Sequence, residues 1–278
     1  MYAAWCSILL HVDATPASIA RLQVALDVAE RHDARITAVF AGVSPEPEGS
    51  FAYSAAAAFD ELANSRRSDW RDMALARLRR AAGDDRSRIA WCEIGGEPLV
   101  GRFVAEAAYA DLLVLGSSTR ADADVGAPPP GFVEAVVFES GRPVLVLPDI
   151  VSQVQIGRSI LVAWNGSAQA ARAVTGALPF LAAAEEVHVA SWSARPPYAP
   201  CSGLSLEGAL ARHGIAAEVH RHAPSSHVGD DLVALAGRLG VDLVVMGCYG
   251  HSRTRERMLG GVSRSMLHAP RLPLLLAH

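Results

Sequence analysis

Short apolar runs alternate with longer amphipathic or alanine-rich stretches along the whole chain. Most of the short runs are apolar at every position, which is typical of parallel strands covered by helices on both faces of a sheet. In the first half, the pattern predicts strands at residues 7–13, 35–41, 88–94, 111–116 and 142–147. It predicts helices between them at residues 17–32, 59–82 and 98–110, with a short helix before the last strand.

The same order of elements then starts again. The run SILVAWN at 159–165 repeats SILLHVD at 7–13, and DLVVMG at 242–247 repeats DLLVLG at 111–116. The second half predicts strands at 159–165, 187–191, 217–222, 242–247 and 273–276, and helices at 168–183, 204–213 and 230–239. One ten-stranded domain with a chance similarity between its halves is the alternative, but repeated landmarks in the same order favour a tandem duplication.

We therefore predict an α/β protein of two tandem domains, each with a five-stranded, mainly parallel, Rossmann-like sheet. The expected domains are residues 1–150 and 151–278, joined by a polar and β-branched segment at 149–157. Residues 51–59 either connect two elements or begin the second helix. Proline at position 16 suits the first helical turn, where its missing N–H leaves no hydrogen bond unmade.

Composition narrows the class of protein. Hydrophobic residues make up 51% of the chain and charged residues 19%, which excludes a disordered protein. A net charge of −4 gives no electrostatic case for binding nucleic acid or an anionic membrane surface. No apolar run reaches the roughly 18–20 residues of a membrane helix, and no positive charge precedes the first apolar stretch as in a secretory signal. Four dispersed cysteines without a C-x-x-C pair indicate a reducing cytoplasm.

A glycine-rich segment is the strongest candidate for chemistry. Gly247 and Gly250 follow the fourth strand of the second half, at the strand end where open α/β sheets bind ligands. Gly260 and Gly261 then precede a helix that contains Ser263. Glycines allow the backbone to approach a bulky anion, and free N–H groups at a helix start favour a phosphate. Sterically required glycines in a βα loop are the alternative interpretation.

The spacing G-x-x-G-x9-G formed by Gly247, Gly250 and Gly260 resembles the nucleotide-binding signature of the universal stress protein family. The D-G-S element of that family, at the end of the first strand, is echoed by Asn165 with the Gly-Ser that follows it, and by Asp13 in the first half. The resemblance covers the whole chain as two family domains, with an adenine nucleotide alpha hydrolase-like fold. It implies that the loop holds the phosphates of ATP and that the strand-end acid lies near the ribose and adenine.

The resemblance also implies an arrangement of the two halves. In the family, the last strand of each unit pairs with its counterpart across a dimer, and residues 143–147 and 273–276 are the matching strands here. We therefore expect an intramolecular pseudo-dimer, and a further homodimer of two chains is left open.

Two positions depart from the family pattern. Gly261 stands where Ser or Thr is expected, so a hydroxyl donor to phosphate is missing, and Ser263 lies two positions further on. Asn165 replaces the acid and keeps one carbonyl acceptor without the charge. Each change removes something like one hydrogen bond, or about 1 kcal/mol of binding free energy.

The first half lacks the loop. Gly116 is followed by no second glycine at the matching place, and Pro130, the last of three successive prolines, takes the place of Gly260. Prolines have no N–H to offer a phosphate. Asp13 without such a cradle is more simply a helix-capping or strand-end residue. We expect ATP, if bound, only in the second half.

These residues suggest three candidate functions. The first is a cytoplasmic stress-response protein that binds ATP or another adenine nucleotide as a regulatory ligand, with hydrolysis slow at most because no general base is evident. The second is an interaction or scaffold protein of the same fold with both pockets empty. The third, an ATP pyrophosphatase-type ligase, lacks its S-G-G-x-D-S loop. His220 and His222 share one face of a strand, but no Cys, Asp or Glu stands at ligand spacing nearby in sequence, so no metal site is predicted.

Overall fold

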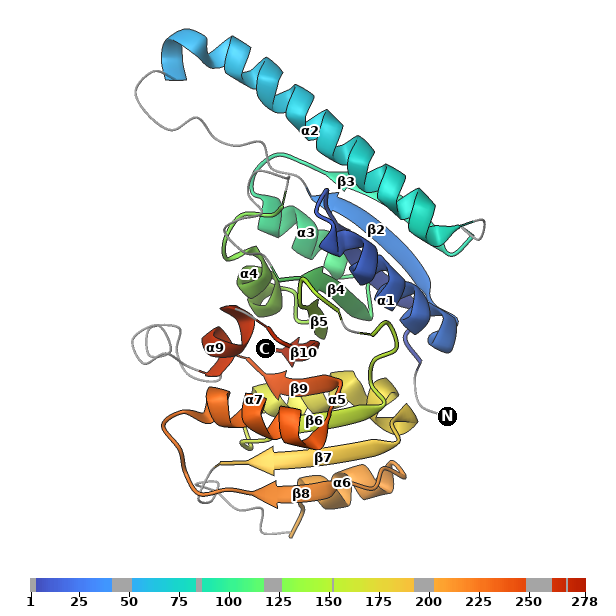
Figure 1. Cartoon of the computed structure of the whole chain (residues 1–278), viewed down its shortest axis with the longest axis vertical. Coiled ribbons are helices and arrows are strands. Elements are labelled where there is room, and N and C mark those ends of the chain that lie inside the picture. The colour runs from blue at the N-terminus through green and yellow to red at the C-terminus, as the bar shows by residue number, and fades with distance from the viewer. Residues whose placement is uncertain are drawn as a thin grey trace.

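The structure is a computed structural model that describes residues 4–41, 52–83, 87–117, 127–151, 153–192, 203–248, 262–268 and 270–278. In this part of the chain, ten strands form one sheet in the order β3-β2-β1-β4-β5-β10-β9-β6-β7-β8. Figure 1 shows the sheet running from β3 at one end of the molecule to β8 at the other, with helices on both faces.

The strands of the first half are β1 (Ser7–Val12), β2 (Arg35–Ala41), β3 (Ile89–Ile94), β4 (Leu112–Gly116) and β5 (Val144–Leu147). Those of the second half are β6 (Ser159–Ala163), β7 (Glu186–Ser191), β8 (Glu218–Arg221), β9 (Leu243–Gly247) and β10 (Leu274–Ala277). Within each half all neighbouring strands are parallel. Both halves have the same strand order, which confirms the predicted α/β fold with its internal repeat.

The helices of the first half are α1 (Ala17–His32), α2 (Ala52–Ala82), α3 (Leu99–Ala107) and α4 (Phe132–Glu139). Those of the second half are α5 (Ala168–Ala183), α6 (Leu206–Arg212), α7 (Val228–Leu239) and α9 (Val262–His268). Helix α2 begins at Ala52, several residues before the predicted start at 59, because the alanine run at 55–58 favours a helix over a connection. No helix among the described residues is long and apolar enough to cross a membrane.

The two halves join through their last strands, β5 and β10. This pairing is antiparallel, with Leu145 opposite Leu275 and both residues fully buried. The family resemblance led us to expect this pairing, and the structure confirms it. The junction leaves no exposed strand edge at the centre of the sheet, so the only free edges of the described sheet are β3 and β8.

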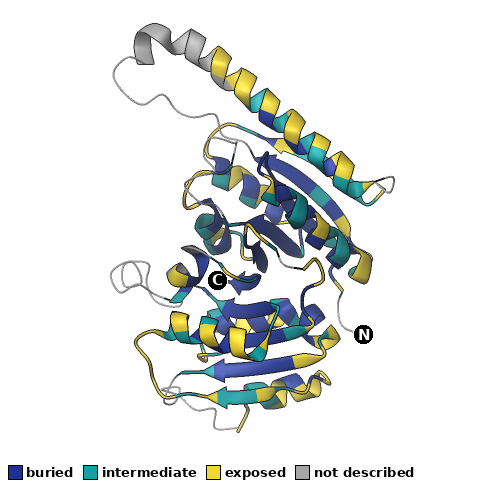
Figure 2. Ribbon diagram, in the orientation of Figure 1, coloured by how far each residue is buried: buried dark blue, intermediate teal, exposed yellow. Residues whose placement is uncertain are grey.

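Alternate residues of each strand face two separate apolar layers. On one side α1, α2, α5 and α6 pack against the sheet, and on the other side α3, α4, α7 and α9 do so. Leu275 of β10 belongs to the first layer, whereas its neighbours Leu274 and Leu276 belong to the second. Figure 2 shows the central strands almost entirely buried and the outward side of α2 largely exposed. Each layer is therefore continuous across both halves.

Side chains of the first layer also link the halves directly. The ring of Trp5 lies edge-on to Phe180 of α5, with 4.7 Å between the centroids. The guanidinium of Arg31 lies 5.5 Å from the centre of the same phenyl ring and donates a hydrogen bond to the carbonyl of Ile156 at 3.0 Å. Phe180 is fully buried, so the end of α1 and the end of α5 share one piece of core.

Candidate functional site

The carboxyl end of β6 carries an ordered turn that leads into α5. The amide of Ser167 donates to Asn165 Oδ1 at 3.0 Å, and Gly166 between them has a positive φ of 76°. Ser167 then caps α5, because its Oγ accepts from the amide of Ala170 at 3.2 Å. Asn165 is exposed, and its amide nitrogen bonds no described residue. The turn therefore presents one polar side chain to solvent at the strand edge where ligands bind in this class of fold.

Gly247 ends β9 beside the same turn. A Cβ on Gly247 would lie 2.4 Å from the amide nitrogen of Ala170 and 2.8 Å from Cβ of Gln169, which no side chain can accommodate. The first turn of α5 therefore packs directly on this glycine, and Gly247 has a steric reason to be glycine whatever the loop binds. Two of the predicted site residues, Asn165 and Gly247, accordingly flank the start of α5.

The amides near Gly247 are only partly available. The amide of Cys248 donates to the carbonyl of Ala277 at 2.8 Å and so extends the β9–β10 pairing by one residue. The predicted Gly250, Gly260 and Gly261 lie outside the described residues. Ser263, in the first turn of α9, is buried, with 4% of its surface exposed. Of the six predicted residues, the structure therefore brings together Asn165 and Gly247.

The equivalent strand end of the first half is closed by a buried cluster around Asp13. Arg21 of α1 donates to Asp13 Oδ2 at 2.7 Å, and both side chains are only 4% exposed. Thr15 donates to Asp13 Oδ1 through its amide at 2.9 Å and through its hydroxyl at 2.5 Å. Both carboxylate oxygens are thus occupied by the protein itself. Asp13 is also only 3% exposed, so its carboxylate is not presented to solvent.

Arg21 also fills the space beside Gly116. A Cβ on Gly116 would lie 2.0 Å from Nη1 of Arg21, so the guanidinium rests directly on the glycine at the end of β4. By the internal repeat, Asp13 corresponds to Asn165 and Arg21 corresponds to Ala173. The second half therefore lacks both members of the ion pair, and a buried alanine stands in the place of the arginine.

Charge and burial shift the acidity of this cluster. Burial alone would raise the pKa of Asp13, but the Arg21 guanidinium and the hydrogen bonds from Thr15 hold that pKa below its usual value. His11 lies 3.7 Å from Asp13 and contacts the rings of Phe103 and Phe132. Burial lowers the pKa of His11 to about 4, against the opposing effect of Asp13. His11 is therefore neutral at pH 7, and the cluster carries no net charge.

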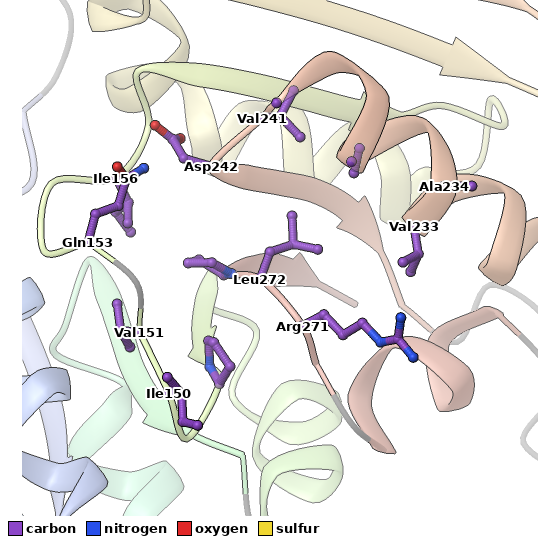
Figure 3. Close-up of a pocket in the computed structure, with 15 residues that line it drawn as sticks. Ile150, Val151, Gln153, Ile156, Val233, Ala234, Val241, Asp242, Arg271 and Leu272 are labelled. Atoms are coloured by element: carbon purple, nitrogen blue, oxygen red, sulfur yellow. The ribbon is translucent and has the colours of Figure 1, made fainter.

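A separate hollow of about 580 Å³ lies at the amino ends of β9 and β10. The segment after β5, the end of α7 and the segment before β10 surround it. Figure 3 shows Ile150 and Val151 on one side of it and Val233 and Leu272 on the other. Asp242 at its rim is already engaged, because its carboxylate accepts from the amides of Gly157 and Arg158 at 2.7 and 3.0 Å. The hollow has a mixed polar and apolar lining and lies away from Gly247, at the opposite end of β9.

The fold defines a class: a three-layer α/β protein of the kind that binds ligands at the carboxyl ends of its parallel strands. Comparison with known proteins gives the family. Residues 157–278 match the model of the universal stress protein family. Residues 157–278 are therefore a universal stress protein domain, and the first half repeats its fold. No curated protein matches the sequence significantly.

Solved structures resemble the whole chain. A universal stress protein from Archaeoglobus fulgidus DSM 4304 superposes with a TM-score of 0.66 at 16% identity, covering 98% of this chain and 97% of that one. PA1789 from Pseudomonas aeruginosa PAO1, described as functionally unknown, gives a TM-score of 0.55 at 15% identity, with 99% and 93% coverage. A putative universal stress protein from Pseudomonas aeruginosa UCBPP-PA14 gives 0.54 at 15% identity, with 99% and 94% coverage. At these identities the likeness establishes the fold, and its extent is consistent with a tandem arrangement.

Proposed function

We propose that the chain is a cytoplasmic stress-response protein that binds ATP or another adenine nucleotide in its second half as a regulatory ligand. The observation that carries the proposal is the difference between the two strand ends. Asp13 is buried and accepts from Arg21 and Thr15, whereas Asn165 is exposed and its amide nitrogen bonds no residue in the described part of the chain. The glycine signature occurs only in the half whose first strand is followed by the exposed Asn165.

The proposed binding residues keep the roles expected from the sequence. Gly247, Gly250, Gly260 and Gly261 would hold the phosphates through backbone amides, and Asn165 and Ser263 would be auxiliary contacts. Asn165 is exposed after the carboxyl end of β6, where it could donate to or accept from a ribose hydroxyl. The described residues there, Asn165, Ser167 and Gly247, include no acid or base. We therefore expect ATP hydrolysis to be slow at most, and the nucleotide to act as a ligand.

We place the boundary of the two domains between residues 150 and 151, in the segment that links β5 to β6. Because β5 and β10 pair across this boundary, the two domains form the proposed intramolecular pseudo-dimer. A nucleotide in the second domain would lie over the ends of β6 and β9, next to the strand that joins the halves. Nucleotide binding would thus stabilise both domains, because they share one sheet.

Thermal unfolding with ATP, ADP and AMP tests the proposal. A ligand at 100 times its dissociation constant should stabilise the fold by about 2.7 kcal/mol, which raises the melting temperature measurably. Asn165→Ala should weaken binding several-fold, by about 1 kcal/mol, through loss of one hydrogen bond. Asn165→Asp, which restores the family's acid, should tighten it. Melting curves that do not respond to any of the three nucleotides at millimolar concentration would remove the proposal.

Pro130→Gly is the matched control. It places a glycine in the first half where Gly260 stands in the second, at an exposed position. Because Arg21 still occupies Asp13, this variant should bind no more nucleotide than the wild type. A second binding event in Pro130→Gly would show that prolines, and not the buried ion pair, keep the first half closed.

An interaction protein with no nucleotide is the second candidate. It is favoured by two observations: the amide of Cys248 is already bonded within the sheet, and Ser263 is buried. Protein partners captured equally with and without nucleotide would support it. Nucleotide that remains bound through purification, identified by mass spectrometry, would count against it.

A further inference from the structure

Two neighbouring strands at the outer edge of the second half carry the same tripeptide, Glu-Val-His. On β7 it is Glu186 to His188, and on β8 it is Glu218 to His220. The strands are parallel, with His188 opposite Glu218 and Ala190 opposite His220. Because side chains alternate along a strand, both glutamates and both histidines point to the same face of the sheet. Figure 1 places these strands side by side at the β8 end of the molecule.

The ring nitrogens and one carboxylate converge. Nδ1 of His188 lies 3.2 Å from Nε2 of His220. Oxygens of Glu218 lie 3.6 Å from His188 Nδ1 and 3.8 Å from His220 Nε2. Atoms held about 2.0–2.1 Å from a tetrahedral Zn²⁺ are about 3.3 Å from one another. The two ring nitrogens already have about this separation, and one oxygen of Glu218 lies within 4.8 Å of both, so a turn of the exposed carboxylate would complete the triangle.

A second carboxylate supports the first histidine. Glu186 lies 3.8 Å from Nε2 of His188, on the side of the ring away from His220. A histidine that binds a metal through one nitrogen commonly directs its other N–H to a carboxylate, which fixes the tautomer and the ring orientation. Glu186 is in the place to do this when His188 binds through Nδ1. Two neutral histidines and two carboxylates together balance the charge of a divalent cation.

The two histidines are more buried than the carboxylate. The side chain of His188 is 9% exposed and that of His220 is 18% exposed, so both rings are held by the fold. The side chain of Glu218 is 69% exposed and can close over an ion that enters from solvent. From these contacts, we infer that His188, His220 and Glu218 form a binding site for Zn²⁺ or a similar nitrogen-preferring divalent ion, with Glu186 as a positioning residue.

The site would tie β8 to β7. β8 is a strand of four residues at a free edge of the described sheet, and its residues are exposed or half-buried. Three protein ligands leave a fourth position for water or another donor. An ion shared by the two strands stabilises the edge in the folded state only, because the ligands are not assembled in the unfolded chain. This inference is independent of the proposed nucleotide site.

Zinc retention by untagged protein tests the inference. The full chain is stripped with a chelator, dialysed against micromolar Zn²⁺, and its zinc content is measured. We expect one Zn²⁺ per chain, whose retention is lost in His220→Ala and weakened in Glu218→Gln. The side chain of Glu218 is 69% exposed, so Glu218→Gln should leave the fold intact, and circular dichroism checks the folding of both variants. Glu186→Gln should weaken the affinity by roughly 10-fold or more through loss of the positioning contact.

His227→Ala is the matched control, because His227 is an exposed histidine whose ring bonds only Ser226 among the described residues. This variant should retain zinc as the wild type does. X-ray absorption at the zinc edge of the wild-type protein should show imidazole and oxygen ligands. Absence of retained zinc in the wild type overturns the inference. Equal retention by His220→Ala and wild type, with circular dichroism showing both folded, overturns it as well.

Discussion

At the scale of single residues, the two halves differ at both positions of one buried ion pair. The first half has Asp13 and Arg21 in a buried ion pair, and the second half has Asn165 and Ala173 in the same places. A buried pair is costly to break, because the remaining partner keeps an uncompensated charge. Replacement of both members at once avoids that cost. The second half contains neither charge of the pair.

The Asp13–Arg21 pair gives the first prediction. Arg21→Ala should reduce the free energy of unfolding by about 3–5 kcal/mol, since it leaves the Asp13 carboxylate buried without its cation. The double variant Asp13→Asn with Arg21→Ala, which copies the second half, should cost clearly less than the sum of the two single variants. Urea denaturation of the four proteins measures the coupling. Strictly additive losses would contradict a coupled pair.

The neighbouring His11 predicts a dependence on pH. Its folded pKa of about 4 lies below the unfolded value of 6.5, so between these values the unfolded chain binds a proton that the folded chain does not. Stability therefore falls as pH decreases from about 6.5 to about 4, by up to about 3 kcal/mol from this group. Asp13, whose pKa is also lowered, acts in the same direction at lower pH.

His11→Leu isolates that contribution, because leucine fills the buried space without a titratable group. Denaturation midpoints measured from pH 7.5 to pH 4.5 should fall less steeply in this variant than in the wild type. Parallel slopes in the two proteins would show that His11 is protonated equally in the folded and unfolded states.

At the scale of elements, the sequence was sufficient to predict the strands. It was insufficient to predict which side chains of neighbouring elements contact one another. Uniformly apolar runs such as 112–116 and 243–247 predict buried parallel strands, and both are present. The contact of Arg21 with Gly116 could not be predicted, because it depends on how α1 is rotated against β4. The approach of His188 to Glu218 depends likewise on the register of β7 and β8. The repeated Glu-Val-His tripeptide is a sequence signal that could have indicated this cluster, but from the sequence we considered only His220 and His222.

The contact between α1 and α5 gives the prediction at this scale. Phe180→Ala should destabilise the protein by about 3–5 kcal/mol, because it empties a fully buried site shared by Trp5 and Arg31 of the other half. Leu62→Ala on α2 is the control, since Leu62 is 53% exposed and its loss should change stability by no more than about 0.5 kcal/mol. Equal effects of the two variants in urea denaturation would mean that the shared core contributes little.

At the scale of the whole molecule, the described strands form one sheet, and its two halves differ where their first strands end, at Asp13 and Asn165. Pairing of β5 with β10 makes both apolar layers continuous, so the closed first half supports the second as a partner subunit would. In the proposed function, only the half with the exposed Asn165 binds a ligand. The asymmetry between Asp13 and Asn165 is therefore the central claim about function.

Equilibrium dialysis of the full chain with radiolabelled ATP tests this claim most directly, because it counts the nucleotides bound per chain. The account predicts one ATP per chain at saturation, reduced in affinity by Asn165→Ala and unchanged in number by Pro130→Gly. Two ATP per chain, or none at millimolar concentration, would contradict it.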